Sequence, residues 1–209
     1  MPRLSRAESQ ARTREKLLAT AKESFLREGY AATSLEKIAD AAGYSKGAVY
    51  SNFRNKDELC LAVIDAVRAE RAASLGEAVS GLTSLGERIA AFQRWAERNI
   101  GDRAWTALEV EFAVHAARDP ALSRELTRRD KVVRDTVVSL VTGHASELGI
   151  ALPMPAEDVA IALLSLGIGL GVQRALDPSV PVRALPELLR LLSGDAGRSN
   201  TAKPRSAKR

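Results

Sequence analysis

The sequence of 209 residues predicts an all-α fold with about nine helices. Apolar residues recur at helical spacing along most of the chain, and no segment alternates apolar and polar residues as a half-buried strand would. Capping pairs also recur at the expected helix starts, such as Ser84 followed three positions later by Glu87. Together these observations favour a helical protein without a sheet.

Capping residues, glycines and prolines divide the chain into the predicted helices. Thr33 and Glu36 form a capping pair for the second helix, and Gly43 provides the turn before the third. Gly29 suits a left-handed cap at the end of the first helix. The predicted ranges are about 13–28, 34–42, 46–53, 56–79, 85–100, 103–117, 120–148, 155–176 and 183–193.

Charge is distributed unevenly along the chain. The net charge is +5, and residues 1–56 alone carry eleven Lys and Arg against six Asp and Glu. Residues 57–193 carry fifteen against nineteen, and the last sixteen residues carry five against one. A basic head on a mildly acidic body favours contact with a polyanion at one end of the molecule.

We therefore expect three segments. Residues 1–56 form a DNA-binding head with a basic N-terminal arm, residues 57–194 form a helical body, and residues 195–209 form a disordered basic tail with little to bury. The single cysteine cannot form an internal disulfide, which fits a cytoplasmic protein. The most apolar run, 159–172, is shorter than the roughly 20 residues that a bilayer requires, so no membrane partner is expected.

The third predicted helix has two distinct faces. Val49 and Phe53 are four residues apart and point inward, toward the core of the head. The opposite face carries small, basic and hydroxyl-bearing residues, namely Lys46, Gly47, Tyr50 and Ser51. This is the profile of a recognition helix that enters the major groove of DNA.

The spacing of many residues in this region resembles the N-terminal domain of TetR-family transcriptional regulators. The resemblance covers about 17–63 and is specific, because many fixed spacings agree at once. Its residues are Thr33, Ile38, Ala39, Ala42, Gly43, Ser45, Lys46, Gly47, Tyr50, Phe53, Lys56 and Leu59. The resemblance implies a ligand-responsive transcriptional repressor that binds a palindromic operator as a homodimer and is released by a small-molecule effector.

The resemblance also implies roles for individual residues in DNA binding. Thr33 and Lys56 match positions that clamp phosphates. The side-chain chemistry itself suggests that Tyr50 offers its hydroxyl to a phosphate and that Lys46, Ser51 and Asn52 read base edges. The full predicted set is Thr33, Ser34, Ser45, Lys46, Gly47, Tyr50, Ser51, Asn52 and Lys56. Two alternatives remain: the lysines are solvated surface charges, and Tyr50 is a packing residue.

The predicted helix at 155–176 is apolar nearly all round, so a second helical surface should cover it. We expect this helix and the last one to pair with their copies in a two-fold four-helix bundle, an arrangement similar to that of TetR-family dimers. The expected interface residues are Ala160, Leu164, Gly167, Gly171, Leu188 and Leu192. The alternative is that the helix forms the core of a single chain.

A cluster of aromatic and polar residues is the candidate effector site. Aromatic walls with a few polar groups are typical of small-molecule cavities, and equally of an ordinary core. The candidate residues are Trp95, Trp105, Glu109, Phe112 and His115. By resemblance, effector binding would shift the helix at 56–79 and change the separation of the two heads.

Other function classes have less support. The chain has two histidines and one cysteine, with no glycine-rich phosphate loop and no Ser/His/Asp spacing, so we do not expect an enzyme or a cofactor. His115 and His144 show no ligand spacing, so no metal site is expected either. A nonspecific, architectural DNA-binding protein is the alternative that the basic tail suggests, and the ratio of specific to nonspecific affinity distinguishes it from a regulator.

Overall fold

The computed structural model of the chain describes residues 5–194, which contain nine α-helices and no strand. The predicted fold class is therefore confirmed. The helices are α1 (Arg6–Ala32), α2 (Leu35–Ala42), α3 (Lys46–Tyr50), α4 (Lys56–Val79), α5 (Leu85–Asn99), α6 (Arg103–Ala116), α7 (Pro120–Leu148), α8 (Ala156–Leu176) and α9 (Ala184–Leu192). The predicted tail at 195–209 and the first four residues of the arm lie outside the described residues.

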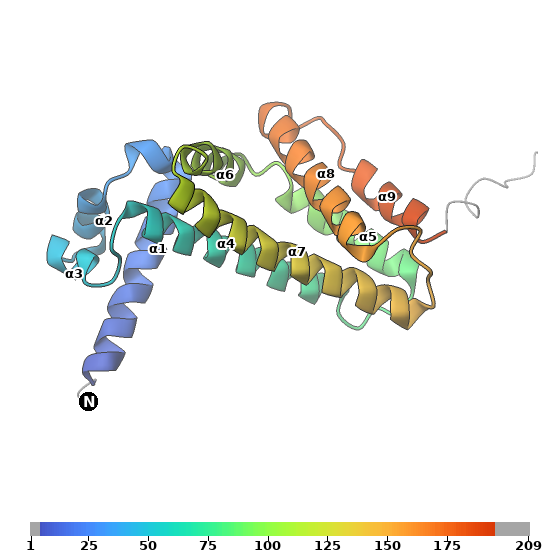
Figure 1. Cartoon of the computed structure of the whole chain (residues 1–209), viewed down its shortest axis with the longest axis horizontal. Coiled ribbons are helices and arrows are strands. Elements are labelled where there is room, and N and C mark those ends of the chain that lie inside the picture. The colour runs from blue at the N-terminus through green and yellow to red at the C-terminus, as the bar shows by residue number, and fades with distance from the viewer. Residues whose placement is uncertain (1–4, 195–209) are drawn as a thin grey trace, which may run out of the picture.

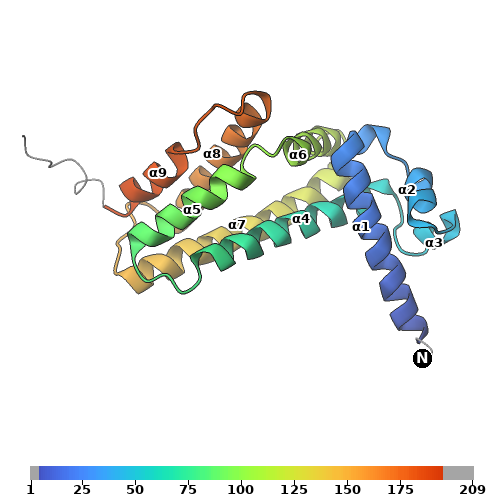
Figure 2. The same cartoon turned by 180° about the vertical axis from the view of Figure 1, so that it is seen from behind.

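The helices form an elongated molecule with α1 to α3 at one end and α5, α8 and α9 toward the other (Figure 1). The two long helices α4 and α7 run side by side between these ends, as the view from behind also shows (Figure 2). Helix α6 lies where the two groups meet and packs against α1, α7 and α8. This position makes α6 the bridge between the head and the body.

The core of the head continues into the body. Phe25 of α1, Ile38 of α2 and Val49 of α3 belong to the same buried cluster as Leu59 of α4 and Phe112 of α6. Helices as short as α2 and α3 are not stable alone, so most of their stability must come from this packing. The buried cluster therefore crosses the predicted domain boundary at residue 56 without interruption.

Three helix ends differ from the sequence prediction. Helix α1 begins at Arg6 instead of about Thr13, because Ser5 and Glu8 form a complete capping box within the segment interpreted as an arm. Helix α2 is capped by Ser34 rather than Thr33, since the Ser34 side chain accepts from the backbone N–H of Lys37. Helix α3 ends at Tyr50, before the predicted end at 53.

Helix α1 is broken near its end by Gly29, which has φ 83° and ψ 172°. The positive φ agrees with the predicted glycine, but the conformation is not the left-handed cap, and helical turns resume as far as Ala32. At this break the Glu111 carboxylate of α6 accepts hydrogen bonds from the backbone N–H groups of Tyr30 and Ala31, each at 2.8 Å. The positive φ requires glycine, and a Cβ on residue 29 would also lie 2.8 Å from Glu111 Oε2 and displace the end of that side chain.

Among residues 5–194, one helix, α8, is long and apolar enough to cross a membrane by length and composition alone. The length argument from the sequence does not hold, because the helix continues beyond the apolar run to Ala156 and Leu176. However, α8 packs against α6, α7 and α9 as a helix of a bundle does. One such helix does not by itself indicate a membrane protein.

Replacing Gly29 with alanine should lower the free energy of unfolding by about 1–3 kcal/mol, because an L-residue is strained at positive φ and would press on Glu111. Gly143→Ala is the matched control, since Gly143 is exposed within α7 and an added Cβ would meet nothing there. That change should raise stability by up to about 1 kcal/mol. Urea unfolding followed by circular dichroism measures both, and equal effects would contradict this description of the α1 break.

Candidate DNA-binding face and ligand cavity

Helix α3 places most of its predicted contact residues on an open surface. Ser45, Lys46 and Gly47 are exposed, and Tyr50 is 53% exposed, while Val49 is fully buried. The Ser45 side chain caps the helix by accepting from the Ala48 N–H at 3.2 Å. The Lys46 ammonium lies 3.6 Å from the Glu36 carboxylate, and a surface ion pair this exposed is weak enough to exchange for another anion.

Gly47 has no internal reason to be glycine. Its φ is not positive, and an added Cβ would meet only Ser45 Oγ, at 3.8 Å. Glycine inside a helix costs about 1 kcal/mol relative to alanine. Packing within the chain therefore does not require glycine here, and the same holds for Gly76, Gly86 and Gly143 in other helices.

The two predicted base readers after Tyr50 are turned toward their own helix. The Ser51 hydroxyl and the Asn52 amide both donate to the Ala48 carbonyl, at 2.9 and 2.8 Å. The Asn52 backbone carbonyl also accepts a hydrogen bond from the Arg14 guanidinium, which stacks over the Phe53 ring. With these donors on Ala48, the Ser51 oxygen and the Asn52 side-chain carbonyl can still accept hydrogen bonds from a base, while donation by the Ser51 hydroxyl would require it to leave Ala48.

Two predicted phosphate contacts have structural roles instead. Thr33 is 2% exposed, and its hydroxyl donates to the Gly29 carbonyl at 2.7 Å, so its side chain is not available to a phosphate. The Lys56 ammonium donates to the carbonyls of Tyr30 and Thr33, each at 3.0 Å, and lies 4.0 Å from the centre of the Tyr30 ring. A cation at these carbonyls stabilises the C-terminal end of α1.

A polar cluster joins the head to α6. The Tyr30 hydroxyl donates to the Asp57 carboxylate at the start of α4 and lies 3.1 Å from His115 Nε2, which is 3.0 Å from the same carboxylate. Burial, followed by the hydrogen bond to Asp57, raises the pKa of the Tyr30 hydroxyl, which therefore stays protonated. Phe112 is fully buried beside this cluster, with its ring edge-on to Tyr30.

The body contains a cavity of about 450 Å³ whose walls come from α4 to α9. A volume of this size lies within the range of small-molecule sites, roughly 300–1,000 Å³. Trp95, Trp105 and Glu109 line it, as predicted from the sequence.

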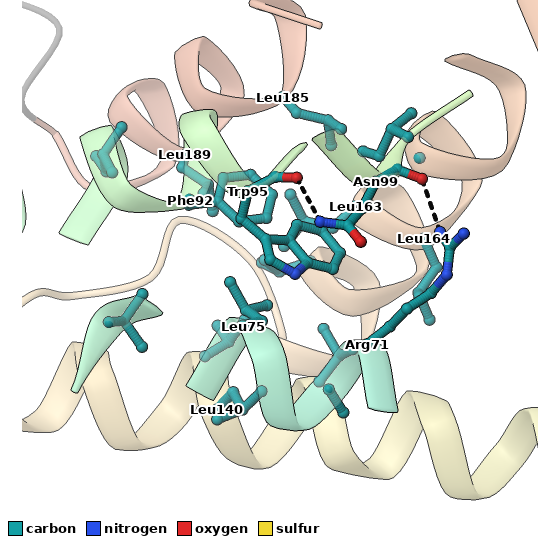
Figure 3. Close-up of a pocket in the computed structure, with 18 of the residues that line it drawn as sticks. Arg71, Leu75, Phe92, Trp95, Asn99, Leu140, Leu163, Leu164, Leu185 and Leu189 are labelled. Atoms are coloured by element: carbon teal, nitrogen blue, oxygen red, sulfur yellow. Dashed lines mark hydrogen bonds between the residues drawn. The ribbon is translucent and has the colours of Figure 1, made fainter. Parts of the chain in front are cut away.

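Phe112 and His115 do not line the cavity. They lie on the side of α6 that faces the head, so this part of the prediction is wrong. Most of the labelled wall residues in Figure 3 are leucines.

Several polar groups of the cavity wall form hydrogen bonds or ion pairs with nearby residues. Arg71 of α4 donates to the Asn99 carbonyl at 2.7 Å, and the Asn99 amide donates to the Trp95 carbonyl at 2.8 Å, as the dashed lines in Figure 3 show. Glu109 is paired with Arg68 at 3.2 Å. The other arginine of the wall, Arg88, is paired with Glu147 at 2.8 Å.

The predicted dimer residues do not form the exposed face of α8 and α9. Ala160 and Gly171 are buried within the chain, Leu164, Gly167 and Leu192 line the cavity, and Leu188 is half-buried. The error is one of rotation about the helix axis, since small residues were taken to mark the outer face. The exposed apolar residues of this region are Ile161, Ile168, Val172, Leu176 and Leu191.

Sequence reasoning missed the residues that join segments far apart in the chain. Tyr30, Asp57 and Glu111 meet at the α1–α4–α6 junction, and Arg71 and Asn99 meet at the cavity wall. No local spacing marks such partners. Within residues 5–194 there is no group of three or more His, Cys, Asp or Glu side chains that could hold a metal ion.

Comparisons with known proteins agree with this fold. Two relatives are similar to the chain in sequence: the transcriptional regulator TtgR of Pseudomonas putida is 39% identical over 67 residues, and the transcriptional repressor AcnR of Corynebacterium diphtheriae is 26% identical over 147 residues. The TtgR match covers 32% of this chain and 31% of TtgR, and the AcnR match covers 69% and 71%. The chain thus spans about a third of TtgR. GusR of Salmonella enterica has a similar structure, with a TM-score of 0.68, 23% identity, and coverage of 88% of this chain and 96% of GusR.

Two family models match different parts of the chain. Residues 17–63 match the model of bacterial regulatory proteins of the tetR family. Residues 87–192, just over half of the chain, match the C-terminal model of BetI-type transcriptional repressors. The chain therefore belongs to the TetR family, whose members are transcriptional regulators and not enzymes.

Proposed function

We propose that the protein is a cytoplasmic repressor that binds a palindromic operator as a homodimer and releases it when a small molecule fills the body cavity. The observation that carries this proposal is the division of α3 into a buried face and an open face that is basic at Lys46 and hydroxyl-bearing at Ser45 and Tyr50. A helix that is anchored on one side and open on the other is suited to enter the major groove.

The contact set proposed for DNA is narrower than the one predicted from sequence. It keeps Ser34, Ser45, Lys46, Gly47 and Tyr50, whose side chains or positions are accessible at least in part. Ser51 and Asn52 stay in it as base readers that can accept through their side-chain oxygens while their donors remain on the Ala48 carbonyl. Thr33 leaves it, and Lys56 is proposed to act through the end of α1, because its donors already bind carbonyls there.

The exposed apolar stripe of α8 supports a homodimer. Ile161, Ile168, Val172 and Leu176 are seven, four and four residues apart, which places them along one side of the helix. Leu176 is 83% exposed, and Ile168 and Val172 also border the cavity. A second copy of the same stripe, related by a two-fold axis, would cover it with an identical apolar surface. Such a dimer presents two heads to two half-sites of an operator.

Helix α6 is the proposed link between the effector and the head. Thr106, Glu109 and Val110 line the cavity, whereas Glu111 and His115 of the same helix hold Tyr30 and Ala31 at the end of α1. A ligand that displaces α6 would therefore move the head through these hydrogen bonds, in addition to any shift of α4. Thermodynamic linkage requires only that the ligand bind the conformation with low DNA affinity more tightly than the conformation with high DNA affinity.

Lys46→Ala and Tyr50→Ala should each weaken binding to the DNA upstream of the protein's own gene by at least about tenfold, since Lys46 is proposed to contact a base, which contributes roughly 1–3 kcal/mol, and Tyr50 a phosphate. Band-shift titrations with competitor DNA measure the loss, and circular dichroism checks that the helices remain. Lys131→Ala, an exposed lysine of α7, is the matched control and should bind like the parent. Binding without sequence preference at any salt concentration would support the architectural alternative instead.

Ile161→Glu should convert the dimer into monomers, because it places a charge in the proposed apolar interface at a residue that does not line the cavity. Leu176→Glu tests the same stripe outside the cavity wall. Val132→Glu on α7 is the matched control, since Val132 is also exposed and apolar but lies off the stripe. Sedimentation velocity should give the 22.5 kDa mass of one chain for the first two variants only. A dimer that survives both changes would place the interface elsewhere.

Glu111→Ala should speed the amide hydrogen exchange of Tyr30 and Ala31, because their N–H groups lose the carboxylate that accepts them. We expect a loss of about 1–3 kcal/mol of local stability. Glu97→Ala on the exposed side of α5 serves as the control and should leave the exchange of residues 26–33 unchanged. Unchanged exchange in Glu111→Ala would exclude α6 as the link to the head.

A further inference from the structure

The indole N–H of Trp95 is buried and has no hydrogen-bond partner within the described residues. A buried donor without a partner costs about 1–3 kcal/mol, so native proteins rarely keep one without a reason. The ring itself is well accommodated, since it stacks against Phe92 with centroids 6.0 Å apart and planes at 19°. Phenylalanine would provide much of the same apolar packing without the unpaired donor.

The position of Trp95 is fixed by the wall of the cavity. Its backbone carbonyl accepts from the Asn99 side chain, and the Asn99 carbonyl in turn accepts from Arg71. Figure 3 shows the indole ring projecting from α5 into the space toward α4, with its nitrogen away from both of these hydrogen bonds. The unpaired donor is therefore held in place at the lining of the cavity rather than left in a flexible loop.

The carboxylate and the two arginines of the wall already have partners, and His144 Nδ1 lies 2.7 Å from the Leu140 carbonyl. Glu109 is neutralised by Arg68, and Arg88 by Glu147. Arg71 donates to the Asn99 carbonyl, stacks over the Trp105 ring with its guanidinium carbon 5.2 Å from the ring centre, and lies 3.8 Å from the Asp102 carboxylate. A charged ligand would have to break one of these pairs or lose its hydration without compensation.

We propose that the cavity takes a neutral, largely apolar molecule with a carbonyl oxygen that accepts a hydrogen bond from Trp95 Nε1. This inference rests on the proposed function, in which the same cavity holds the effector. The apolar walls bind the hydrocarbon part of the molecule, and the unpaired indole N–H of Trp95 selects for the oxygen. A hydrogen bond from a buried donor discriminates between ligands that differ only in that oxygen.

The test uses the homodimer, or the chain as purified, with two probes of similar shape. 2-Acetylnaphthalene carries the carbonyl, and 2-ethylnaphthalene lacks it. We expect calorimetry to show that the ketone binds roughly two- to tenfold more tightly, the ratio that one net hydrogen bond gives. In ¹⁵N–¹H spectra the ketone should also move the Trp95 indole resonance, which Trp95→Phe identifies by removing it.

Trp95→Phe should bring the affinity ratio of the two probes to about one, because it removes the donor, and the ring volume it also removes affects both probes alike. Trp105→Phe is the matched control in the other tryptophan of the wall and should keep the ratio of the parent. A ratio near one in the parent, or a ratio unchanged in Trp95→Phe, would overturn the inference. So would tighter binding of 2-naphthoate, which would make Arg71 the selecting group. If neither probe binds while the band shift with operator DNA persists, the inference fails and the proposed DNA-binding function stands.

Discussion

The stability of α2 and α3 constrains the rest of the structure. These helices have eight and five residues, too few to persist in water without tertiary contacts. Their apolar residues are buried against α1, α4 and α6 in one continuous cluster. The surface proposed to bind DNA is therefore held by helices of the body, and a change in the body can reach it without any flexible connection.

The same constraint explains the composition of α6. This helix of 14 residues must complete the core of the head with Leu108 and Phe112 and also form part of the cavity wall with Thr106 and Glu109. Glu111 adds a carboxylate that satisfies two N–H groups at the α1 break, where glycine interrupts the regular helix. One short helix thus shares its faces between the two sites, which supports its proposed role in coupling them.

Features encoded locally could be predicted from the sequence, whereas features that depend on distant contacts could not. Capping pairs such as Ser84 and Glu87 placed helix starts correctly because both partners lie within one turn. Thr33 was assigned to DNA because its spacing fits the family, yet its hydroxyl is buried against Gly29. The outward face of α8 was also misjudged, because a helix that is apolar nearly all round carries no periodicity from which its rotation can be inferred.

Three features that lower the stability of the isolated chain lie where the three proposed partners would bind. Gly47 weakens α3 although nothing inside the chain requires it, and it faces the proposed DNA. The stripe around Ile168 exposes apolar surface of α8, where a second copy is proposed to bind. Trp95 leaves a donor unpaired at the cavity wall, where a ligand oxygen is proposed to accept. Each feature costs stability in the isolated chain and is relieved by a different partner, as expected where function rather than folding selects the residue.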